Sequence, residues 1–216
     1  MRPTPDLRCY LVTGAGSREH VVDVARRAVA GGSRIVQVRS KPISARDLYA
    51  LTEEIALAVG DTAHVLVDDR VDVALALRRR SLPVHGVHVG QDDLDVRDVR
   101  VLLGEDAIIG LTTGTRALVE AANEFAGVID YVGAGPFRPT PTKNSGREPL
   151  GVEGSRELVE LSEVPVVAIG DVTADDAQVL AGTGVAGLAV VRGLMDAADP
   201  GAYARRLLDG FEAGRR

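Results

Sequence analysis

Polar residues at alternating positions follow an apolar segment early in the chain, and their types suit the binding of an anion. Gln37, Arg39 and Lys41 lie two residues apart, directly after Ile35 and Val36. Side chains at this spacing on an extended strand project to the same side. Three polar groups on one side, two of them cationic, are costly to bury unless an anion lies among them. We therefore predict an anion site here; the alternative is that Arg39 and Lys41 lie beyond the strand in solvent.

Two pairs of adjacent acidic residues follow later apolar segments. Asp68 and Asp69 end one segment, and Asp92 and Asp93 follow another. Mg²⁺ takes one or two protein carboxylates, keeps several waters and completes its shell with substrate phosphates. The four histidines are not spaced as zinc ligands. The pairs therefore favour a Mg²⁺ site, and the alternative is that Asp69 and Asp93 cap the helices that follow them.

The segment 136–154 is long and rich in Pro, Gly, Thr and basic residues. Thr140, Thr142 and Lys143 lie in its proline-stiffened part. Two hydroxyls and an ammonium held in a stiff segment predict a clamp for phosphate or diphosphate. The alternative is an ordinary surface loop that happens to carry these residues.

Short β-branched segments alternate with amphipathic stretches rich in Ala and Leu, which is typical of parallel strand–helix units. We predict eight strands: Tyr10 to Thr13, Ile35 to Arg39, Val65 to Asp68, Gly86 to Val89, Ile108 to Thr112, Tyr131 to Gly135, Val166 to Gly170 and Leu188 to Val191. We predict helices over His20 to Ala30, Ala45 to Val59, Val71 to Arg79, Val96 to Leu103, Arg116 to Phe125, Ser155 to Leu161, Ala174 to Ala181 and Pro200 to Phe211, with a short extra helix over Gly193 to Ala197.

Eight units in 216 residues, with no linker between them, favour a single-domain TIM (β/α)8 barrel over residues 1–216. A doubly wound open sheet is the main alternative. Against it, Gly14 and Gly16 are not followed by a third glycine at the spacing of a dinucleotide-binding turn. In a barrel, the polar residues at the carboxyl ends of the strands are the catalytic candidates, and phosphate often binds after the last two strands.

Composition excludes several classes of protein. The net charge is −6 without a basic run beyond three arginines, so a nucleic-acid partner is not expected. No apolar run approaches the ~18 residues of a membrane span. The single cysteine, Cys9, cannot form an internal disulfide, which favours a reducing compartment and a cytoplasmic location. A homo-oligomer is left open.

Seven segments, taken in order, resemble the thiamine phosphate synthase family. They are QVRSK (37–41), DDRVDVALA (68–76), GVHVGQDDL (86–94), IIGLTT (108–113), DYVGAGPFRPTPTK (130–143), VPVVAIGDV (164–172) and GLAVVRGLM (187–195). The resemblance implies a transferase that joins hydroxymethylpyrimidine diphosphate to a hydroxyethylthiazole phosphate, or its carboxylated form. The products would be thiamine phosphate and pyrophosphate.

The resemblance also implies roles for individual residues. Arg39, Lys41, Lys143 and Thr112 would be catalytic, and Asp69 and Asp93 would hold Mg²⁺. The substrate-binding set would be Gln37, Val38, Arg39, Ser40, Lys41, Asp68, Thr112, Thr140, Pro141, Thr142, Lys143, Asp171, Val191 and Arg192. Within it, Gln37, Arg39, Lys41 and Lys143 would hold the pyrimidine diphosphate, and Thr140 and Thr142 the thiazole phosphate. His85 and His88 are interpreted as structural.

Three residues depart from the family pattern. Asp68 replaces the usual Asn, Asp171 replaces a glycine and Arg192 stands where Ser is common. A carboxylate beside a phosphate repels it unless a cation intervenes, so we expect Asp171 and Arg192 to form a compensating pair. The departures keep two alternatives open: a thiazole tautomerase-like relative, and a non-catalytic barrel that binds ligands of the thiamine pathway.

Overall fold

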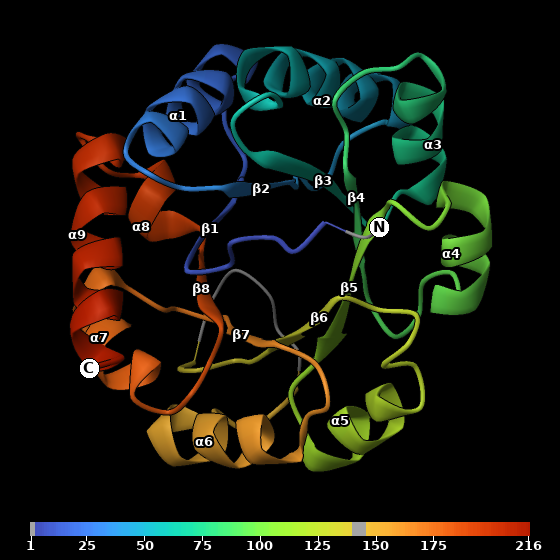
Figure 1. Cartoon of the computed structure of the whole chain (residues 1–216). Coiled ribbons are helices and arrows are strands. Elements are labelled where there is room, and N and C mark those ends of the chain that lie inside the picture. The colour runs from blue at the N-terminus through green and yellow to red at the C-terminus, as the bar shows by residue number, and fades with distance from the viewer. Residues whose placement is uncertain (1–2, 140–145) are drawn as a thin grey trace.

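The computed structural model describes residues 3–139 and 146–216, and the strands in it close into a parallel barrel in the order β1 to β8 (Figure 1). The strands are β1 (Cys9–Val12), β2 (Ile35–Val38), β3 (His64–Asp68), β4 (Gly86–Val89), β5 (Ile108–Thr113), β6 (Tyr131–Ala134), β7 (Val166–Ala168) and β8 (Gly187–Val190). The predicted TIM barrel and its eight strands are confirmed, and most strands end one or two residues earlier than predicted.

Helices surround the barrel on its outside (Figure 1). They are α1 (Arg18–Ala30), α2 (Ala45–Val59), α3 (Val71–Arg79), α4 (Val96–Leu103), α5 (Arg116–Asn123), α6 (Gly151–Leu161), the 3-10 turn η1 (Ala174–Asp176), α7 (Ala177–Ala181), α8 (Arg192–Met195) and α9 (Pro200–Gly214). Side chains cap several helices as their types predict: Ser44 accepts from the N–H of Asp47, and Asp95 from that of Arg97.

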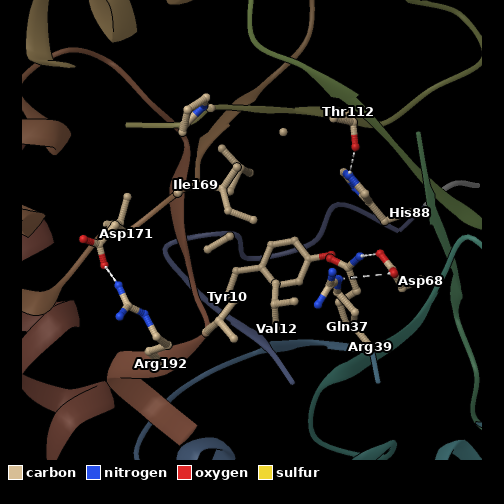
Figure 2. Close-up of a pocket in the computed structure, with 18 of the residues that line it drawn as sticks. Tyr10, Val12, Gln37, Arg39, Asp68, His88, Thr112, Ile169, Asp171 and Arg192 are labelled. Carbon is tan, nitrogen blue, oxygen red and sulfur yellow. Dashed lines mark hydrogen bonds and ion pairs between the residues drawn. The ribbon is translucent and has the colours of Figure 1, made fainter. Parts of the chain in front are cut away.

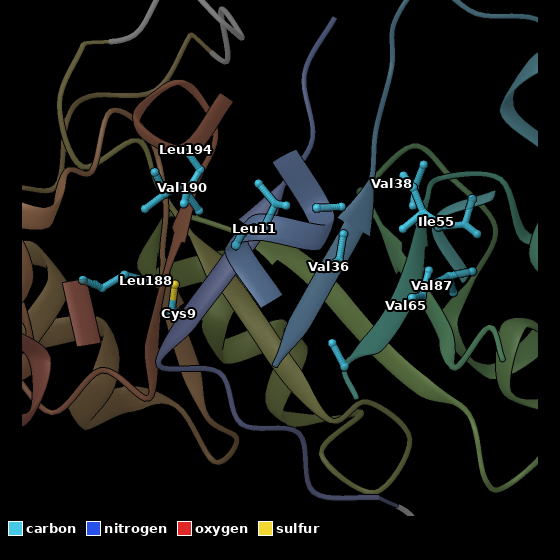
Figure 3. Close-up of a cluster of buried hydrophobic side chains, with 14 of the residues drawn as sticks. Cys9, Leu11, Val36, Val38, Ile55, Val65, Val87, Leu188, Val190 and Leu194 are labelled. Atoms are coloured by element: carbon cyan, nitrogen blue, oxygen red, sulfur yellow. The ribbon is translucent and has the colours of Figure 1, made fainter. Parts of the chain in front are cut away.

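Alternation along each strand divides the core into two clusters. Outward residues pack against the helices, as Leu11, Val36 and Val87 do (Figure 3). Inward residues fill the barrel, and the inner cluster comprises Leu7, Tyr10, Val12, Ile35, Leu66, Ile108, Tyr131, Val167 and Ala189. Because the side-chain period of a strand is two, the inward residue nearest each carboxyl end faces the mouth of the barrel. Those positions determine the site.

Several helix boundaries differ from the prediction: α1 begins two residues earlier, α5 ends two residues earlier and α9 ends three residues later. Helix α6 begins at Gly151 rather than Ser155, because Leu150 and Gly151 donate backbone hydrogen bonds to Pro136 and Phe137 and so fix the first turn. Two glycines at its start made this turn resemble a loop. The predicted extra helix is present as α8, which begins one residue and ends two residues earlier than expected.

Candidate active site

A cavity of about 470 Å³ opens at the carboxyl ends of the strands (Figure 2). Its lining includes the inward residues Gln37, Asp68, His88, Thr112 and Val191, as the alternation described above predicts. The strand ends of the whole barrel therefore meet around one space, as expected for the functional face of this fold.

One end of the cavity is built around the buried carboxylate of Asp68. The Arg39 Nε and Lys41 Nζ atoms lie 3.5 and 3.3 Å from Asp68 Oδ2, and Gln37 Nε2 donates to Oδ1 at 2.5 Å. Thr13 fixes the backbone of Arg39, since its hydroxyl bonds both the N–H and the carbonyl of that residue at 2.9 and 2.8 Å. The predicted convergence of Gln37, Arg39 and Lys41 is confirmed.

Charge and burial oppose each other at Asp68. Burial, and next the charge of Asp69, raise the pKa of Asp68, while Lys41 and Arg39 act in the opposite direction. Burial alone would lower the pKa of Lys41, but its hydrogen bond to Asp69 and the charge of Asp68 raise it. The carboxylates of Asp68 and Asp69 thus keep Lys41 protonated and cationic.

The two proposed metal ligands lie together beside this end. Burial raises the pKa of Asp93, and the charge of Asp69 raises it further. Asp69 has a positive φ of 58° at the sharp turn after β3. Its carboxylate forms an ion pair with Lys41. Asp93 Oδ2 accepts the N–H of Gly90 at 2.7 Å, so it braces its own loop rather than capping α4. That second role belongs to Asp95.

These carboxylates fit Mg²⁺ better than zinc. Among the described residues, no group of three or more His, Cys, Asp or Glu side chains is arranged to hold a metal. Two neighbouring carboxylates suit a hard divalent cation that keeps waters and takes further oxygens from a phosphate. The donor set is therefore compatible with the predicted ion.

A chain of hydrogen bonds crosses the floor of the cavity from Asp68 to Thr112. Gln37 Oε1 accepts from the Tyr10 hydroxyl at 3.1 Å, and the hydroxyls of Tyr10 and Tyr131 are 2.7 Å apart. His88 Nδ1 lies 2.9 Å from the Tyr131 hydroxyl, and its Nε2 lies 2.9 Å from Thr112 Oγ1. Six side chains from β1 to β6 are linked in this way, and all of them except Tyr131 are labelled in Figure 2.

The direction of the chain follows from counting donors. Tyr10 gives its proton to Gln37, so the Tyr131 hydroxyl must donate to Tyr10. His88 Nδ1 must then donate to Tyr131, and in the neutral ring Nε2 accepts from Thr112. The Thr112 hydroxyl therefore has its proton committed to the floor and offers lone pairs to the cavity.

Two glycines make room for this floor. A side chain at Gly110 would bring its Cβ within 2.3 Å of the Tyr131 hydroxyl and 2.5 Å of His88 Nδ1, and one at Gly133 would meet His88 Cε1 at 3.1 Å. Both glycines occupy inward positions. The lack of side chains at these two positions leaves space on β5 and β6 for the polar side chains of the floor.

The opposite end of the cavity carries an ion pair between Asp171 and Arg192 (Figure 2). The predicted pairing of these two residues is confirmed. Gly170 and Asp171 have φ values of 98° and 57°, so the chain turns sharply after β7. Arg138 Nη1 donates to the Asp171 carbonyl at 3.0 Å, and Arg138 is itself ion-paired with Asp176.

The structure tests the placement of the other candidate residues. Val191 lines the cavity, whereas Val38 is fully buried in the outer cluster and its side chain cannot contact a ligand. The Val38 side chain points outward because it alternates with the inward residues Gln37 and Arg39. Ser40 is half-buried and does not line the cavity. Thr140, Pro141, Thr142 and Lys143 lie outside the described residues.

Sequence reasoning missed Tyr10 and Tyr131 and gave His88 no contact with the site. Their positions carried a usable signal, since each occupies an inward strand position with a polar atom that needs a partner. Arg147 was also missed; it lines the cavity and donates to the Thr113 carbonyl at 2.5 Å. Nothing in its local sequence marks that contact, which joins two segments 34 residues apart.

The sequence matches the model of a known family. A model described as thiamine monophosphate synthase matches residues 9–194, which span the barrel from β1 to α8. The chain belongs to the thiamine monophosphate synthase family. Two curated relatives agree: the thiamine-phosphate synthases of Corynebacterium efficiens and Corynebacterium jeikeium are 82% and 65% identical over the whole of both chains. Membership makes the chain an enzyme of the transferase class.

Solved structures of this family share the fold. Thiamine phosphate pyrophosphorylase from Pyrococcus furiosus is 30% identical, covers 99% of each chain and has a TM-score of 0.83. A 3-hexulose-6-phosphate synthase from Salmonella typhimurium is 15% identical with a TM-score of 0.71, and that likeness is one of fold alone. In the part of the chain that the structure describes, no helix is long and apolar enough to cross a membrane.

Proposed function

We propose that this chain joins hydroxymethylpyrimidine diphosphate to hydroxyethylthiazole phosphate, or its carboxylated form, by dissociative loss of pyrophosphate. The observation that carries the proposal is a single cavity with a cationic, carboxylate-rich end, a polar floor and a separate ion-paired end. Family membership supports the reaction, and the two ends offer one place for each phosphorylated substrate.

Arg39 and Lys41 bind the diphosphate at the Asp68 end. Both cations are in place before substrate arrives. Thr13 holds the backbone of Arg39 while its guanidinium lies beside Asp68, and Lys41 is paired with Asp68 and Asp69. Charges that are already oriented stabilise a developing anion without reorganisation. As the bond from the pyrimidine methylene carbon to the diphosphate oxygen breaks, these two cations stabilise the electron pair that leaves with pyrophosphate.

Asp69 and Asp93 would hold the Mg²⁺ ion. When bound, the ion would supply a further positive charge toward the diphosphate oxygens. Burial and like charge, which raise the pKa of Asp93, would both be offset by the cation.

The floor positions the pyrimidine. Thr112 presents an acceptor to the cavity, which suits the exocyclic amine of an aminopyrimidine. The cation left by pyrophosphate is delocalised into that ring, and an acceptor close to the amine favours the charge. His88 and Tyr131 act through Thr112 as positioning residues.

The thiazole nitrogen then donates its electron pair to the methylene carbon, and the carbon–nitrogen bond replaces the carbon–oxygen bond. No protein nucleophile or external oxidant is needed. The backbone after β7 and β8 would hold the thiazole phosphate. A cytoplasmic location is also part of the proposal, because the single cysteine favours a reducing compartment.

Turnover with both substrates tests the proposal. Purified protein with Mg²⁺, hydroxymethylpyrimidine diphosphate and hydroxyethylthiazole phosphate should release pyrophosphate and form thiamine phosphate in equal amounts. The carboxylated thiazole is assayed in parallel, with release of carbon dioxide as the readout. Binding of both ligands without product would favour the non-catalytic barrel. Isomerisation of the carboxylated thiazole phosphate in the absence of the pyrimidine would favour the tautomerase-like relative.

A further inference from the structure

The inward side chains around the cavity divide into a polar half and an apolar half. The polar side chains come from β2 to β5 and are Gln37, Asp68, His88 and Thr112. The apolar ones come from β1, β7 and β8 and form what we call the apolar wall: Val12, Val167, Ile169 and Ala189. Strands four places apart in a closed barrel of eight face each other, so β1, β7 and β8 lie across from β5, β3 and β4. Each strand of the wall therefore faces a strand that carries a polar side chain.

Ile169 is the member of the apolar wall with the most open position. It is partly buried, whereas Val12, Val167 and Ala189 are at most 4% exposed. Figure 2 shows Ile169 in the middle of the cavity, with the Asp171–Arg192 pair on one side and Thr112 on the other. Its side chain therefore borders the space where two bound substrates would meet.

The backbone of Ile169 has its own hydrogen bonds within the protein. Its N–H donates to the Ala134 carbonyl at 3.0 Å, and its carbonyl accepts the N–H of Phe137 at 2.9 Å. A Cβ at Gly135 would overlap the Ile169 carbonyl oxygen and lie 2.9 Å from Ile169 Cγ2. This glycine lets the end of β6 pack closely against Ile169 and hold its side chain in place. A fixed apolar side chain whose backbone groups are satisfied gives a water molecule no partner at this position.

The reaction proposed above makes the exclusion of water important. After pyrophosphate leaves, the methylene carbon carries positive charge until the thiazole nitrogen attacks it. A water molecule that reached the carbon first would form a carbon–oxygen bond with one of its electron pairs and lose a proton. The product would be the alcohol hydroxymethylpyrimidine in place of thiamine phosphate. Ordered waters need two to four polar partners, and active sites suppress the hydrolysis of reactive intermediates by expelling water.

We propose that the apolar wall, and Ile169 above all, keeps water away from the methylene carbon between the loss of pyrophosphate and the attack by the thiazole. This inference rests on the proposed function and assigns Ile169 to the choice of nucleophile, not to the binding of a phosphate. The polar half holds the diphosphate and the pyrimidine. The apolar half then borders the side from which the thiazole ring arrives, and it offers water no hydrogen bond there.

The test compares Ile169→Thr with Ile169→Val. Threonine and valine are close in shape, so both variants are shortened alike and differ in one hydroxyl. Each protein receives Mg²⁺ and hydroxymethylpyrimidine diphosphate, with and without hydroxyethylthiazole phosphate, in water labelled with ¹⁸O. Pyrophosphate, thiamine phosphate and the alcohol are quantified. The label should appear in the alcohol, because water attacks carbon and not phosphorus.

We expect wild type and Ile169→Val to form thiamine phosphate and pyrophosphate in nearly equal amounts. Ile169→Thr should form a share of labelled alcohol about fivefold or more above that of Ile169→Val, the factor typical of one added hydrogen bond to a water. Val12→Thr places a hydroxyl deeper in the same wall and should raise the share by a smaller factor. Val179→Thr is the control, since Val179 is exposed on α7 and does not line the cavity, and it should match wild type.

Two results would overturn the inference. One is an equal share of alcohol in Ile169→Thr and Ile169→Val, which would show that the polarity of the wall does not matter. The other is ¹⁸O in the pyrophosphate with unlabelled alcohol, which would place the attack of water at phosphorus. If circular dichroism shows that Ile169→Thr is unfolded, Val12→Thr and wild type form the same valine–threonine comparison.

Failure of the proposed function gives a different result, namely a wild-type protein that forms no thiamine phosphate. The samples without thiazole then still test the wall, because the release of labelled alcohol compares the same two variants. Release of neither alcohol nor pyrophosphate by any of the proteins would overturn both the proposed function and this inference. Coupled turnover by wild type together with equal alcohol from the two variants would overturn the inference alone.

Discussion

The two ends of the cavity solve different electrostatic problems. At the Asp68 end, three carboxylates, those of Asp68, Asp69 and Asp93, face the two cations Arg39 and Lys41. At the other end, a rigid turn holds one exposed ion pair, Asp171 with Arg192. An excess of carboxylates has room for a divalent cation, whereas a carboxylate tied to a guanidinium has room for an anion. Aspartate can therefore help to build a cation site at one end of a cavity and an anion site at the other.

The largest expected effect is at the carboxylate-rich end. Asp93→Ala should lower Mg²⁺-dependent turnover by on the order of 100-fold or more, because a bound metal stabilises leaving-group charge by several kcal/mol. Turnover is measured across a Mg²⁺ titration. Asp92→Ala is the matched control: both side chains are exposed and neither lines the cavity, but only Asp93 accepts the N–H of Gly90 and lies beside Asp69. Full activity of Asp93→Ala would remove Asp93 from the metal site.

A smaller effect is expected at the floor that joins the two ends. Tyr131→Phe should lower the free energy of unfolding by about 1–3 kcal/mol, because the buried Tyr10 and the partly buried His88 each lose a hydrogen bond. Urea unfolding measures the loss. Tyr49→Phe is the control, since its hydroxyl lies at the surface beside Arg80.

The same variant sharpens the direction of the floor chain. In the wild type at a pH where the ring is neutral, ¹⁵N spectra should show His88 protonated at Nδ1, and in Tyr131→Phe that preference should weaken. His88→Gln identifies the signal. A wild-type ring protonated at Nε2 would contradict the donor count and make Thr112 a donor toward the cavity.

The smallest effect is expected at the amino-terminal end of the barrel, away from the cavity. Burial, then the charges of His64 and Arg78, lower the pKa of His85 from 6.5 to about 4, and its Nδ1 accepts the N–H of Val65 at 3.0 Å. Because the pKa is depressed on folding, the stability it contributes is complete above pH 6.5 and is lost as the pH falls toward 4. The loss should be on the order of 1 kcal/mol, since solvent screens a half-buried ring.

Urea unfolding of wild type and His85→Gln between pH 7 and 4.5 checks this. The wild type should lose more stability than the variant over that range. Equal slopes for the two proteins would show that His85 titrates normally in the folded state. His85 would then contribute no more to the pH dependence of the free energy of unfolding than an exposed histidine does.

The fold and much of the Asp68 end could be predicted because their signals are local. Alternation along 37–41 places three side chains on one face without knowledge of any partner. Periodicity likewise predicts the barrel strands to within a residue or two. The pairing of Asp171 with Arg192 was also predictable, since the carboxyl ends of neighbouring strands meet.

The floor could not be predicted, because it depends on depth within the barrel. Tyr10 and Tyr131 are 121 residues apart and meet only through strand register and the space left by two glycines. Val38 shows the opposite error: a residue inside a binding motif in the sequence lies outside the barrel in space. A sequence motif identifies the segment near a site, and the strand register determines which of its side chains face the cavity.

Steady-state kinetics of Asp68→Asn and Arg192→Gln, with each substrate varied in turn, test the two-ended account most directly. The account predicts that Asp68→Asn changes KM for the pyrimidine diphosphate, lowering it by about threefold or more because Arg39 and Lys41 are released from a carboxylate. It predicts that Arg192→Gln raises KM for the thiazole phosphate alone. If each variant instead alters the KM of the other substrate, or both alter the same one, the assignment of one end to each substrate is contradicted.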